Sequence, residues 1–390
     1  MLSKRVKNIA QSETLAIDSK AKQLKKEGKD VVILAAGEPD FNTPENIKQA
    51  AKKAIDSNFT RYTPVGGITE LRKAVAEKFK RENNISYDAS EVMISCGGKH
   101  SLYNIMMAVL DKGDEAILPV PYWVSYKEMI KLADAKPVFC KTDDIFKLTA
   151  DMVSDKITDK TKMLVLNSPC NPSGAVVEHD EIKKIADLAI KHNFYVLSDE
   201  VYEHFVYNDK KNLSIASLNE DIKKLTITSN SVSKTYAMTG WRIGYTGAGK
   251  EIIKAMENLQ SHSTSNPSNI AQYAALEALT TPQDSVKGMV KAFDERRRFV
   301  HKRLNEIHDI SCVEPEGAFY AFADISKTGM KSIDFASNLL DEALVAVVPG
   351  IAFGMEGYIR LSYAASIHEI ERGLDRIDKW VKQKRANSVG

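Results

Sequence analysis

The chain has 390 residues, a length that suggests about two domains. Hydrophobic residues make up 43% of it, which is enough for a large core and excludes a disordered protein. The formal net charge is only +2, and no basic run resembles a nucleic-acid-binding stripe, so no nucleic-acid partner is expected.

The sequence also argues against a membrane protein and against a metalloprotein. No apolar run reaches the ~18 residues that cross a bilayer, and residues 1–17 lack the apolar segment of a secretory signal. The cysteines lie far apart with no C-x-x-C pair, and the histidines have irregular spacings, which disfavours zinc sites and disulfide frameworks. We therefore expect a cytoplasmic protein without a resident metal.

The first predicted element is an N-terminal helix that contains the basic stretch KQLKKEGKD at residues 22–30, a pattern typical of a solvated helix face. Apolar strands and helical segments then alternate through the middle of the chain. This alternation predicts an α/β fold with a mostly parallel sheet covered by helices on both faces. Strands are predicted at 91–95, 114–120, 162–167, 194–199, 223–230 and 242–247, and helices at 97–110 and 178–192.

The chain changes character near residue 282. A charged helical segment, KAFDERRRFVHKRLNEI, leads to short strands in GAFYAFAD, VAVVPG and YIRLSYA and then to a final helix, which predicts a smaller α+β unit. Near the N-terminus, VVILAAGEPDF crosses from this unit toward the sheet. We therefore predict a large cofactor-binding domain over residues 46–281 and a small domain formed by residues 1–45 and 282–390.

Polar residues follow several predicted strands, and in a parallel sheet such residues share the crevice beyond the carboxyl ends of the strands. Gly97 and Gly98 stand between a strand and a helix, where free N–H groups bind phosphate well. The glycines do not form a nucleotide P-loop. Met93 replaces the glycine that the P-loop pattern needs, and Lys99 is followed by His100 instead of Ser or Thr.

Asp199 ends an apolar strand, where a carboxylate either caps a turn or meets a specific cation. Because a buried carboxylate without a partner is costly, Lys234, Arg242 and a protonated ring nitrogen of a ligand are the candidate partners. The loop NSPCNPSG at 167–174 is shaped by its prolines and glycine. Its Asn171 is suited equally to a ligand oxygen and to a turn cap.

Together these residues suit a phosphorylated, planar, nitrogenous aldehyde. Lys234, in NSVSKTYAMTGWRIG, would form a Schiff base with the aldehyde. Ser231, Ser233 and Arg242 would join the helix end at Gly98 in holding the phosphate.

The remaining residues would contact the ring of such a ligand. Asp199 would keep the ring nitrogen protonated, which makes the ring an electron sink. Trp123 would cover the face of the ring, unless it only fills the core. Asn171 and Tyr202 would form hydrogen bonds with the phenolic oxygen.

The chain resembles the fold-type I, pyridoxal 5′-phosphate-dependent aminotransferases of class I/II, and in particular their bacterial aspartate aminotransferase branch. The resemblance runs almost from end to end. It implies the fold of these transferases, pyridoxal 5′-phosphate as cofactor, and a ping-pong exchange of an amino group between amino acids and 2-oxo acids. The motifs that carry it, in the family's order, are AGEPDFNTP, YTPVGGITELR, GGKHSLYN, VPYWVSY, NSPCNPSG, SDEVYEHF, SVSKTYAMTGWRIGY, GAFYAF, VVPGIAFG and YIRLSYA.

The resemblance also implies roles for single residues. Lys234, Asp199 and Tyr202 match the family's catalytic residues. Arg360 matches the arginine that binds the α-carboxylate of the substrate, and its planar fork suits that group. Gly37 approaches the same carboxylate through its backbone.

Further matches concern the subunit interface and the residues shared by cofactor and substrate. Tyr62 matches the tyrosine that reaches the cofactor phosphate of the neighbouring subunit, which implies a homodimer with shared active sites. Lys99, Trp123 and Asn171 match residues that contact both cofactor and substrate.

Lys99 bears most directly on the choice of substrate. In the resembled branch a lysine there accompanies acidic substrates, because a cation meets the distal carboxylate of aspartate or glutamate. The segment IAQSETLAI at 9–17 departs from the family pattern, since Glu13 adds a negative charge between Ser12 and Thr14. Prephenate, aromatic amino acids and a carbon–sulfur lyase reaction on the same scaffold are the alternatives.

Overall fold

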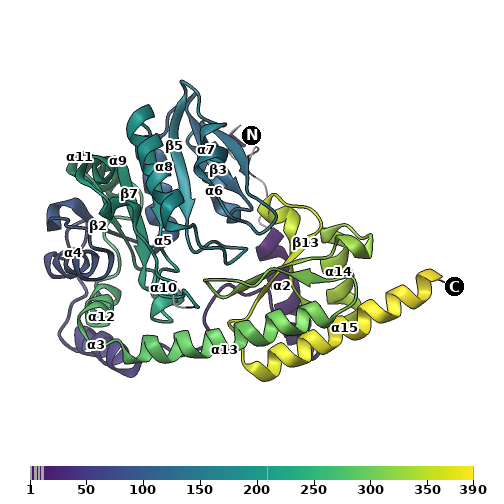
Figure 1. Ribbon diagram of the computed structural model, residues 1–390. Helices are drawn as coiled ribbons and strands as arrows, with labels where there is room; N and C mark the ends of the chain where they lie inside the picture. Colours follow the sequence, from purple (N-terminus) through teal and green to yellow (C-terminus); the bar gives the residue numbers. More distant parts are fainter. Residues whose placement is uncertain (1, 4–6, 8, 10–12, 209, 390) are drawn as a thin grey trace.

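The computed structural model describes residues 2, 3, 7, 9, 13–208 and 210–389 of the chain. A seven-stranded sheet and a four-stranded sheet lie on two sides of the molecule, and the long helix α13 (Asp284–Glu306) runs along both parts (Figure 1). Among the described helices, none combines the length and the apolar character needed to span a membrane.

The larger sheet has the strand order β2-β8-β7-β6-β5-β3-β4. Strands β3 to β7 run parallel to one another, and β8 is antiparallel to both of its neighbours. The predicted α/β fold with a mostly parallel sheet is therefore confirmed. Its strands are β2 (Val92–Ser95), β3 (Glu115–Val120), β4 (Lys136–Lys141), β5 (Thr161–Asn167), β6 (Tyr195–Asp199), β7 (Thr226–Ser231) and β8 (Gly244–Gly247).

Helices cover both faces of this sheet, because successive side chains of a strand point to opposite faces. On β5, Met163 and Val165 belong to the core formed with α5, α6 and α11, whereas Leu164 and Leu166 belong to the core formed with α7, α8 and α9. The helices of this part are α3 (Glu45–Asp56), α4 (Thr69–Asn83), α5 (Gly98–Val109), α6 (Val124–Leu132), α7 (Ala150–Ser154), α8 (His179–His192), α9 (Glu220–Leu225), α10 (Val232–Thr235), α11 (Lys250–Ser261) and α12 (Asn269–Thr280).

One strand was predicted to begin too early. Residues 223–225 form the end of α9, and β7 begins directly after it. The side-chain oxygen of Asn219 caps α9 by accepting hydrogen bonds from the N–H groups of Asp221 (3.0 Å) and Ile222 (3.0 Å). Since apolar residues continue across the junction of helix and strand, hydrophobicity alone does not mark it.

The second sheet is antiparallel, with the strand order β12-β13-β10-β9. The N-terminal helix α2 lies among these C-terminal elements (Figure 1), and β1 pairs in parallel with β11, with Val32 opposite Val345. The elements of this part are α2 (Glu13–Lys26), β1 (Val32–Ile33), β9 (Ser311–Cys312), β10 (Tyr320–Asp324), α14 (Ser332–Ala343), β11 (Val345–Ala346), β12 (Val348–Pro349), β13 (Tyr358–Ser362) and α15 (Ile367–Val389).

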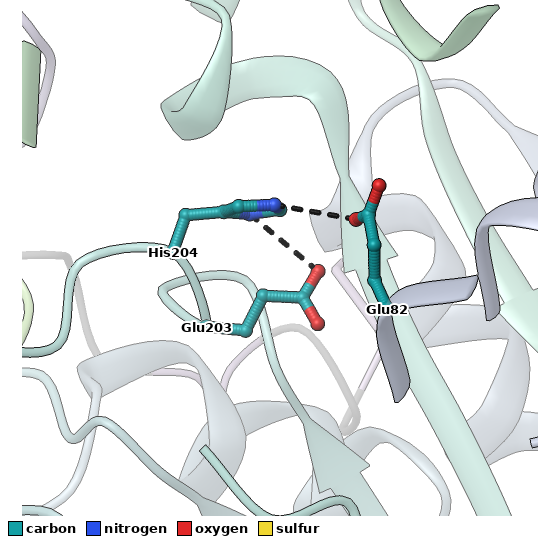
Figure 2. Close-up of side chains that lie close together, drawn as sticks. All are labelled: Glu82, Glu203 and His204. Carbon is teal, nitrogen blue, oxygen red and sulfur yellow. Dashed lines mark ion pairs between the residues drawn. The ribbon is translucent and has the colours of Figure 1, made fainter. Parts of the chain in front are cut away.

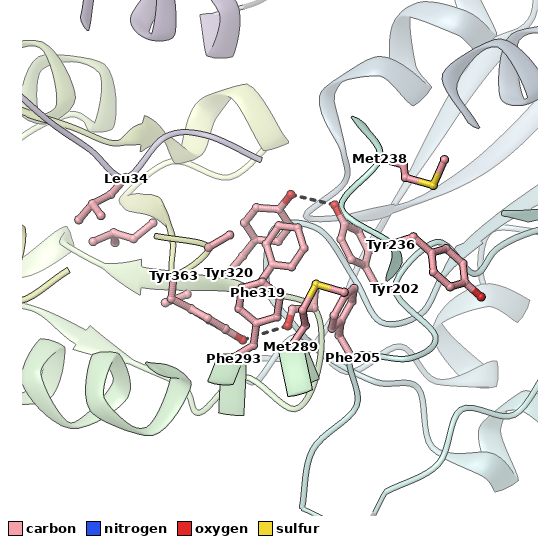
Figure 3. Close-up of a cluster of buried hydrophobic side chains, with 14 of the residues drawn as sticks. Leu34, Tyr202, Phe205, Tyr236, Met238, Met289, Phe293, Phe319, Tyr320 and Tyr363 are labelled. Atoms are coloured by element: carbon pink, nitrogen blue, oxygen red, sulfur yellow. Dashed lines mark hydrogen bonds between the residues drawn. The ribbon is translucent and has the colours of Figure 1, made fainter. Parts of the chain in front are cut away.

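A core rich in aromatic side chains lies where the two parts meet (Figure 3). The ring centroids of Phe205, Phe293 and Phe319 are 5.3 to 5.6 Å apart. This continuous core draws on both predicted domains. The division into residues 46–281 and residues 1–45 with 282–390 therefore stays a prediction.

Candidate active site

A cavity of about 280 Å³ opens at the carboxyl ends of β5, β6 and β7, beside the N-terminus of α5. This is the crevice that an open parallel sheet offers to ligands. The predicted site residues that line it are Gly37, Gly98, Lys99, Trp123, Asn171, Asp199, Tyr202, Ser231, Ser233, Lys234, Arg242 and Arg360. Only Tyr62 of the predicted set lies elsewhere.

Asp199 is buried at the end of β6, and its direct partners are neutral. Its carboxylate oxygens accept hydrogen bonds from Tyr126 Oη (2.6 Å) and from the N–H of Val201 (3.2 Å). Burial raises the pKa of Asp199 to about 6, although these hydrogen bonds and the charge of Lys234 act in the opposite direction. No described residue forms an ion pair with Asp199, and Arg242, one of the predicted partners, is held elsewhere. Such a carboxylate favours a cationic group on a ligand.

Lys234 lies on the short helix α10, and its amine donates a hydrogen bond to the carbonyl of Gly37. Loss of solvent in the cavity lowers the pKa of Lys234 to about 8; the charge of Arg360 adds to this effect, and Glu38 opposes it. An amine with a pKa near neutrality is available as a nucleophile and as a base.

The N-terminus of α5 forms a cradle for an anion. Gly97 precedes the helix with φ 92°, a conformation that side chains rarely adopt, and a Cβ there would lie 2.3 Å from Nη2 of Arg242. Arg242 Nη1 also donates a hydrogen bond to the carbonyl of Thr239 (2.8 Å). Ser231 packs against Gly98, where a Cβ would lie 3.3 Å from the Ser231 Cβ. Free N–H groups, a guanidinium and a hydroxyl thus meet at one place, a combination that suits a phosphate.

Arg360 brings a buried positive charge from β13 into the cavity. Its Nη1 donates a hydrogen bond to Asn171 Oδ1 (3.0 Å) and its Nη2 to the carbonyl of Ala35 (2.8 Å), while its Nε has no partner among the described residues. The guanidinium lies 4.4 Å from the ring centroid of Tyr320, and burial lowers its pKa. In the described part of the chain no carboxylate pairs with it, so a carboxylate on a ligand suits this site.

Aromatic side chains form the remaining walls. Tyr202 Oη is 2.8 Å from Tyr320 Oη, and burial raises the pKa of Tyr202 well above its ordinary value. Trp123 precedes α6, and the ammonium of Lys99 lies 4.9 Å from its ring centroid. Partial burial, together with the charge of Arg242, lowers the pKa of Lys99.

Tyr62 does not reach the cavity of its own chain. Its side chain is 91% exposed and lies in an open hollow that also contains Phe59, Asn266 and Asn269. An exposed tyrosine of this kind is available to another protein surface.

Comparisons with known proteins agree with this geometry. The family model of the class I and II aminotransferases matches residues 29–377. The chain belongs to this family. It is 48% identical to an aspartate aminotransferase of Bacillus sp. (strain YM-2), with 98% of this chain and 99% of that protein covered. It is also 48% identical to a probable aspartate/prephenate aminotransferase of Rickettsia conorii, with 98% of each covered.

The likeness of this aminotransferase extends to a solved structure. The crystal structure of the aspartate aminotransferase from Rhizobium meliloti superposes with a TM-score of 0.94 at 43% identity and covers 98% of this chain and 99% of that one. The predicted membership of the aminotransferases, their fold and their class of activity are confirmed.

Sequence reasoning missed two tyrosines of the aminotransferase site. Tyr126 donates the hydrogen bond to Asp199, and its signal is its position three residues after Trp123, which places it one helical turn along α6. Tyr320 contacts both Tyr202 and Arg360, and its signal is the alternation of side chains in the strand of GAFYAF.

The segment that departs from the family pattern lies largely outside the described residues. Ser12 is not described, and neither are the side chains of Glu13 and Thr14. The effect of Glu13 on the preference for acidic substrates stays a prediction.

We predict that Asp199→Asn stabilises the cofactor-free protein at neutral pH. The folded-state pKa of about 6 lies above the ordinary value of 3.8, so the carboxyl costs stability increasingly as the pH rises through this range. A shift of about two units corresponds to roughly 3 kcal/mol above pH ~6. Urea denaturation of both proteins at pH ~7.5 and ~4 measures this difference, which should disappear at the lower pH.

Asp187→Asn provides the control, because Asp187 is exposed on α8 and its change should leave the stability unaltered at both pH values. If Asp199→Asn is less stable than the wild type at neutral pH, the protein itself satisfies the carboxylate and no cationic ligand is needed.

Proposed function

We propose that this aminotransferase binds pyridoxal 5′-phosphate in the cavity at the strand ends, joined to Lys234 by a Schiff base. The observation that supports this most strongly is the buried carboxylate of Asp199, which forms no ion pair with any described residue and shares the cavity with an amine of lowered pKa. A ligand with both a protonated ring nitrogen and an aldehyde satisfies the two groups together.

The other parts of the coenzyme match further groups of the cavity. The N-terminus of α5, with Arg242, Ser231 and Ser233, suits the phosphate. The half-buried ring of Trp123 suits the flat face of the pyridine. Asn171 and Tyr202 suit the phenolic oxygen, since both are buried polar side chains on the cavity wall.

When bound, the coenzyme supplies an electron-withdrawing ring conjugated to the amino group of the substrate. The chain supplies the proton transfer. The Lys234 amine, whose pKa of about 8 in the cavity lies near neutrality, would accept the α-proton of the substrate. Asp199 would stabilise a positive charge on the ring nitrogen, and the burial of its carboxylate would strengthen this interaction.

Arg360 binds the α-carboxylate of the amino acid in this proposal. Asn171 and Ala35 fix two of its nitrogens, so the guanidinium is oriented before the substrate arrives. The backbone of Gly37 lies at the same cavity wall and completes the α-carboxylate site.

We propose aspartate and glutamate, with the corresponding 2-oxo acids, as the substrates of the ping-pong reaction. Lys99 supports this choice, because its ammonium lies at the cavity beside Trp123 and meets no carboxylate of the described chain. The relative from Bacillus sp. (strain YM-2) is named an aspartate aminotransferase. Prephenate is the second candidate, because the relative from Rickettsia conorii is named for both substrates.

We further propose a homodimer in which Tyr62 of each subunit completes the cofactor site of the other. Tyr62 is 91% exposed and Phe59 beside it is 40% exposed, an arrangement that favours contact with another protein surface. The family resemblance implies that Tyr62 contacts the phosphate of the coenzyme bound to the other subunit.

Replacing Lys234 by Ala should lower aminotransferase activity with aspartate and 2-oxoglutarate by roughly 10³-fold or more, since nucleophile and base are lost together. Borohydride reduction of the wild type loaded with pyridoxal 5′-phosphate, followed by peptide mapping, should place the label on Lys234. A label on another lysine, or an alanine variant that retains most of its activity, would contradict the assignment.

Lys99→Met tests the substrate class. The KM for aspartate and glutamate should rise by roughly ten- to a hundredfold, the effect of losing one charged hydrogen bond, while the KM for phenylalanine stays near the wild-type value. Lys127→Met is the matched control, because Lys127 lines a neighbouring hollow but not the cavity. Equal losses for acidic and aromatic amino acids would remove Lys99 from substrate recognition.

Subunit mixing tests the shared site. Tyr62→Ala and Lys234→Ala homodimers should each be weakly active, and a mixed dimer should regain one site that holds both native residues. Activity should therefore rise after joint refolding of the two variants. A mixture that stays at the mean of its two components would show that Tyr62 serves its own subunit or none.

A further inference from the structure

A cluster of buried and partly exposed polar side chains connects α4 to the strand ends that carry the site. Figure 2 shows three of its members, in which the His204 ring lies close to the carboxylates of Glu82 (3.3 Å) and Glu203 (3.7 Å). None of the members lines the cavity, so the chemistry proposed above leaves them unexplained. We call this the Glu203 cluster, and it consists of Lys78, Glu82, Asn83, Glu200, Glu203 and His204.

Glu203 holds the residues that precede Lys234. Its Oε1 accepts a hydrogen bond from Asn230 Nδ2 (2.6 Å), and Asn230 Oδ1 accepts one from the N–H of Ser231 (2.7 Å). Ser231 in turn caps α10, because its Oγ accepts a hydrogen bond from the N–H of Ser233 (3.2 Å).

The cluster also reaches the residue that follows Lys234. His204 Nδ1 lies 3.7 Å from Glu203 Oε1 and 3.3 Å from the hydroxyl of Thr235. The turn that carries Lys234 is thus bonded to Glu203 through Asn230 on one side and lies against His204, next to Glu203, on the other, although Glu203 itself touches neither the cavity nor Lys234.

Lys78 supplies the positive charge that this arrangement needs. Its side chain is fully buried, and its ammonium forms an ion pair with Glu203 and donates a hydrogen bond to Asn83 Oδ1 (2.8 Å). Burial alone would raise the pKa of Glu203, but the charges of Lys78 and His204 outweigh it and hold this pKa below its ordinary value. Glu203 is therefore an ionised acceptor, and hydrogen bonds to an ionised group are the strong ones.

The same side chains have the spacing of a metal site. Ligand atoms of Glu82, Glu203 and His204 all lie within 4.8 Å of one another. The ammonium of Lys78 is already bonded to Glu203, however, and lies 3.7 Å from Glu82. A divalent cation would meet this charge in surroundings that screen it poorly, so the cluster is balanced by lysine and not by a metal ion.

We propose that Glu203 is the positioning residue of the lysine turn. Through Asn230 and His204 it fixes Ser231 and Thr235 on either side of Lys234, and so orders the amine and the phosphate cradle before the coenzyme binds. Pre-ordering reduces the entropy lost on binding, so Glu203 increases the affinity for pyridoxal 5′-phosphate without contacting it. This inference rests on the coenzyme proposed above.

Glu203→Gln is the central test, because glutamine keeps the shape and replaces one acceptor oxygen by a donor. We expect the dissociation constant for pyridoxal 5′-phosphate to rise about tenfold or more, which corresponds to one hydrogen bond to a charged group. Absorbance titration of the full-length cofactor-free protein measures this constant. The pH midpoint of the absorbance change of the bound coenzyme gives a second readout, and it should move because the turn that carries Lys234 is less fixed.

Two further variants separate positioning from stability. Glu77→Gln makes the same change at an exposed residue of α4 outside the Glu203 cluster, so its dissociation constant should stay within about twofold of the wild type. The double variant Lys78→Met with Glu203→Leu removes both buried charges, which often preserves stability. Its thermal midpoint should lie near that of the wild type, whereas its affinity for the coenzyme should remain low.

Three results would overturn the proposal in distinguishable ways. Wild-type affinity and an unchanged pH midpoint in folded Glu203→Gln, or wild-type affinity in the double variant, would leave Glu203 with a structural role only. A thermal midpoint that zinc chloride raises, but only when both Glu82 and Glu203 are intact, would establish a metal site instead. A wild type that takes up no pyridoxal 5′-phosphate would refute the proposed function, and this inference with it.

Discussion

The burial of the Asp199 carboxylate without a positive partner is the constraint on which the site depends. Ionised carboxylates are rarely buried unless they are paired, and among the described residues the hydrogen-bond donors to this one are the Tyr126 hydroxyl and one backbone N–H. The protein thus holds an unfavourable charge in the place where a ligand relieves it. Arg360 repeats the arrangement with the opposite sign, since its guanidinium is buried without a carboxylate partner among the described residues. The cavity is therefore complementary to a molecule that brings both a cation and an anion.

The Glu203 cluster supports the turn that carries Lys234, next to the buried Asp199 carboxylate. At the cavity, Asp199 and Arg360 have hydrogen bonds but no ion pair among the described residues, whereas the Glu203 carboxylate pairs with a buried lysine and accepts hydrogen bonds from Asn83 and Asn230. A site with buried charges needs a rigid support, because a flexible turn would let these groups move and weaken their interaction with a charged ligand. The chain places both layers on the same two strand ends, those of β6 and β7.

The sequence predicts most of this site because its chemistry follows strand ends. Asp199, Asn171 and Lys234 each come directly after, or close to, an apolar run, and parallel strands bring such ends together. Tyr126 and Tyr320 were not predicted, because an aromatic residue that lines a site has the same spacing in the sequence as one that fills the hydrophobic core. Residues 223–225 were assigned to a strand because Leu225 continues the apolar run of β7. They belong instead to α9, whose first turn is capped by Asn219. Asn230 and Glu203 were missed because their contact joins distant turns, which no local pattern reveals.

The contacts of Arg360 with the N-terminal segment bear on when each part of the site is completed during synthesis. One guanidinium nitrogen is bound by the carbonyl of Ala35, and the N–H of Ser362 bonds the carbonyl of Leu34 (2.7 Å), so the first and last tenths of the polypeptide close on each other. Ribosomal synthesis releases Gly98 through Arg242 long before Arg360. The residues of the proposed phosphate cradle are therefore synthesised before the proposed α-carboxylate site is complete. C-terminal truncations that remove β13 would take Arg360 from the cavity, together with Ile359 and Leu361 of the hydrophobic core.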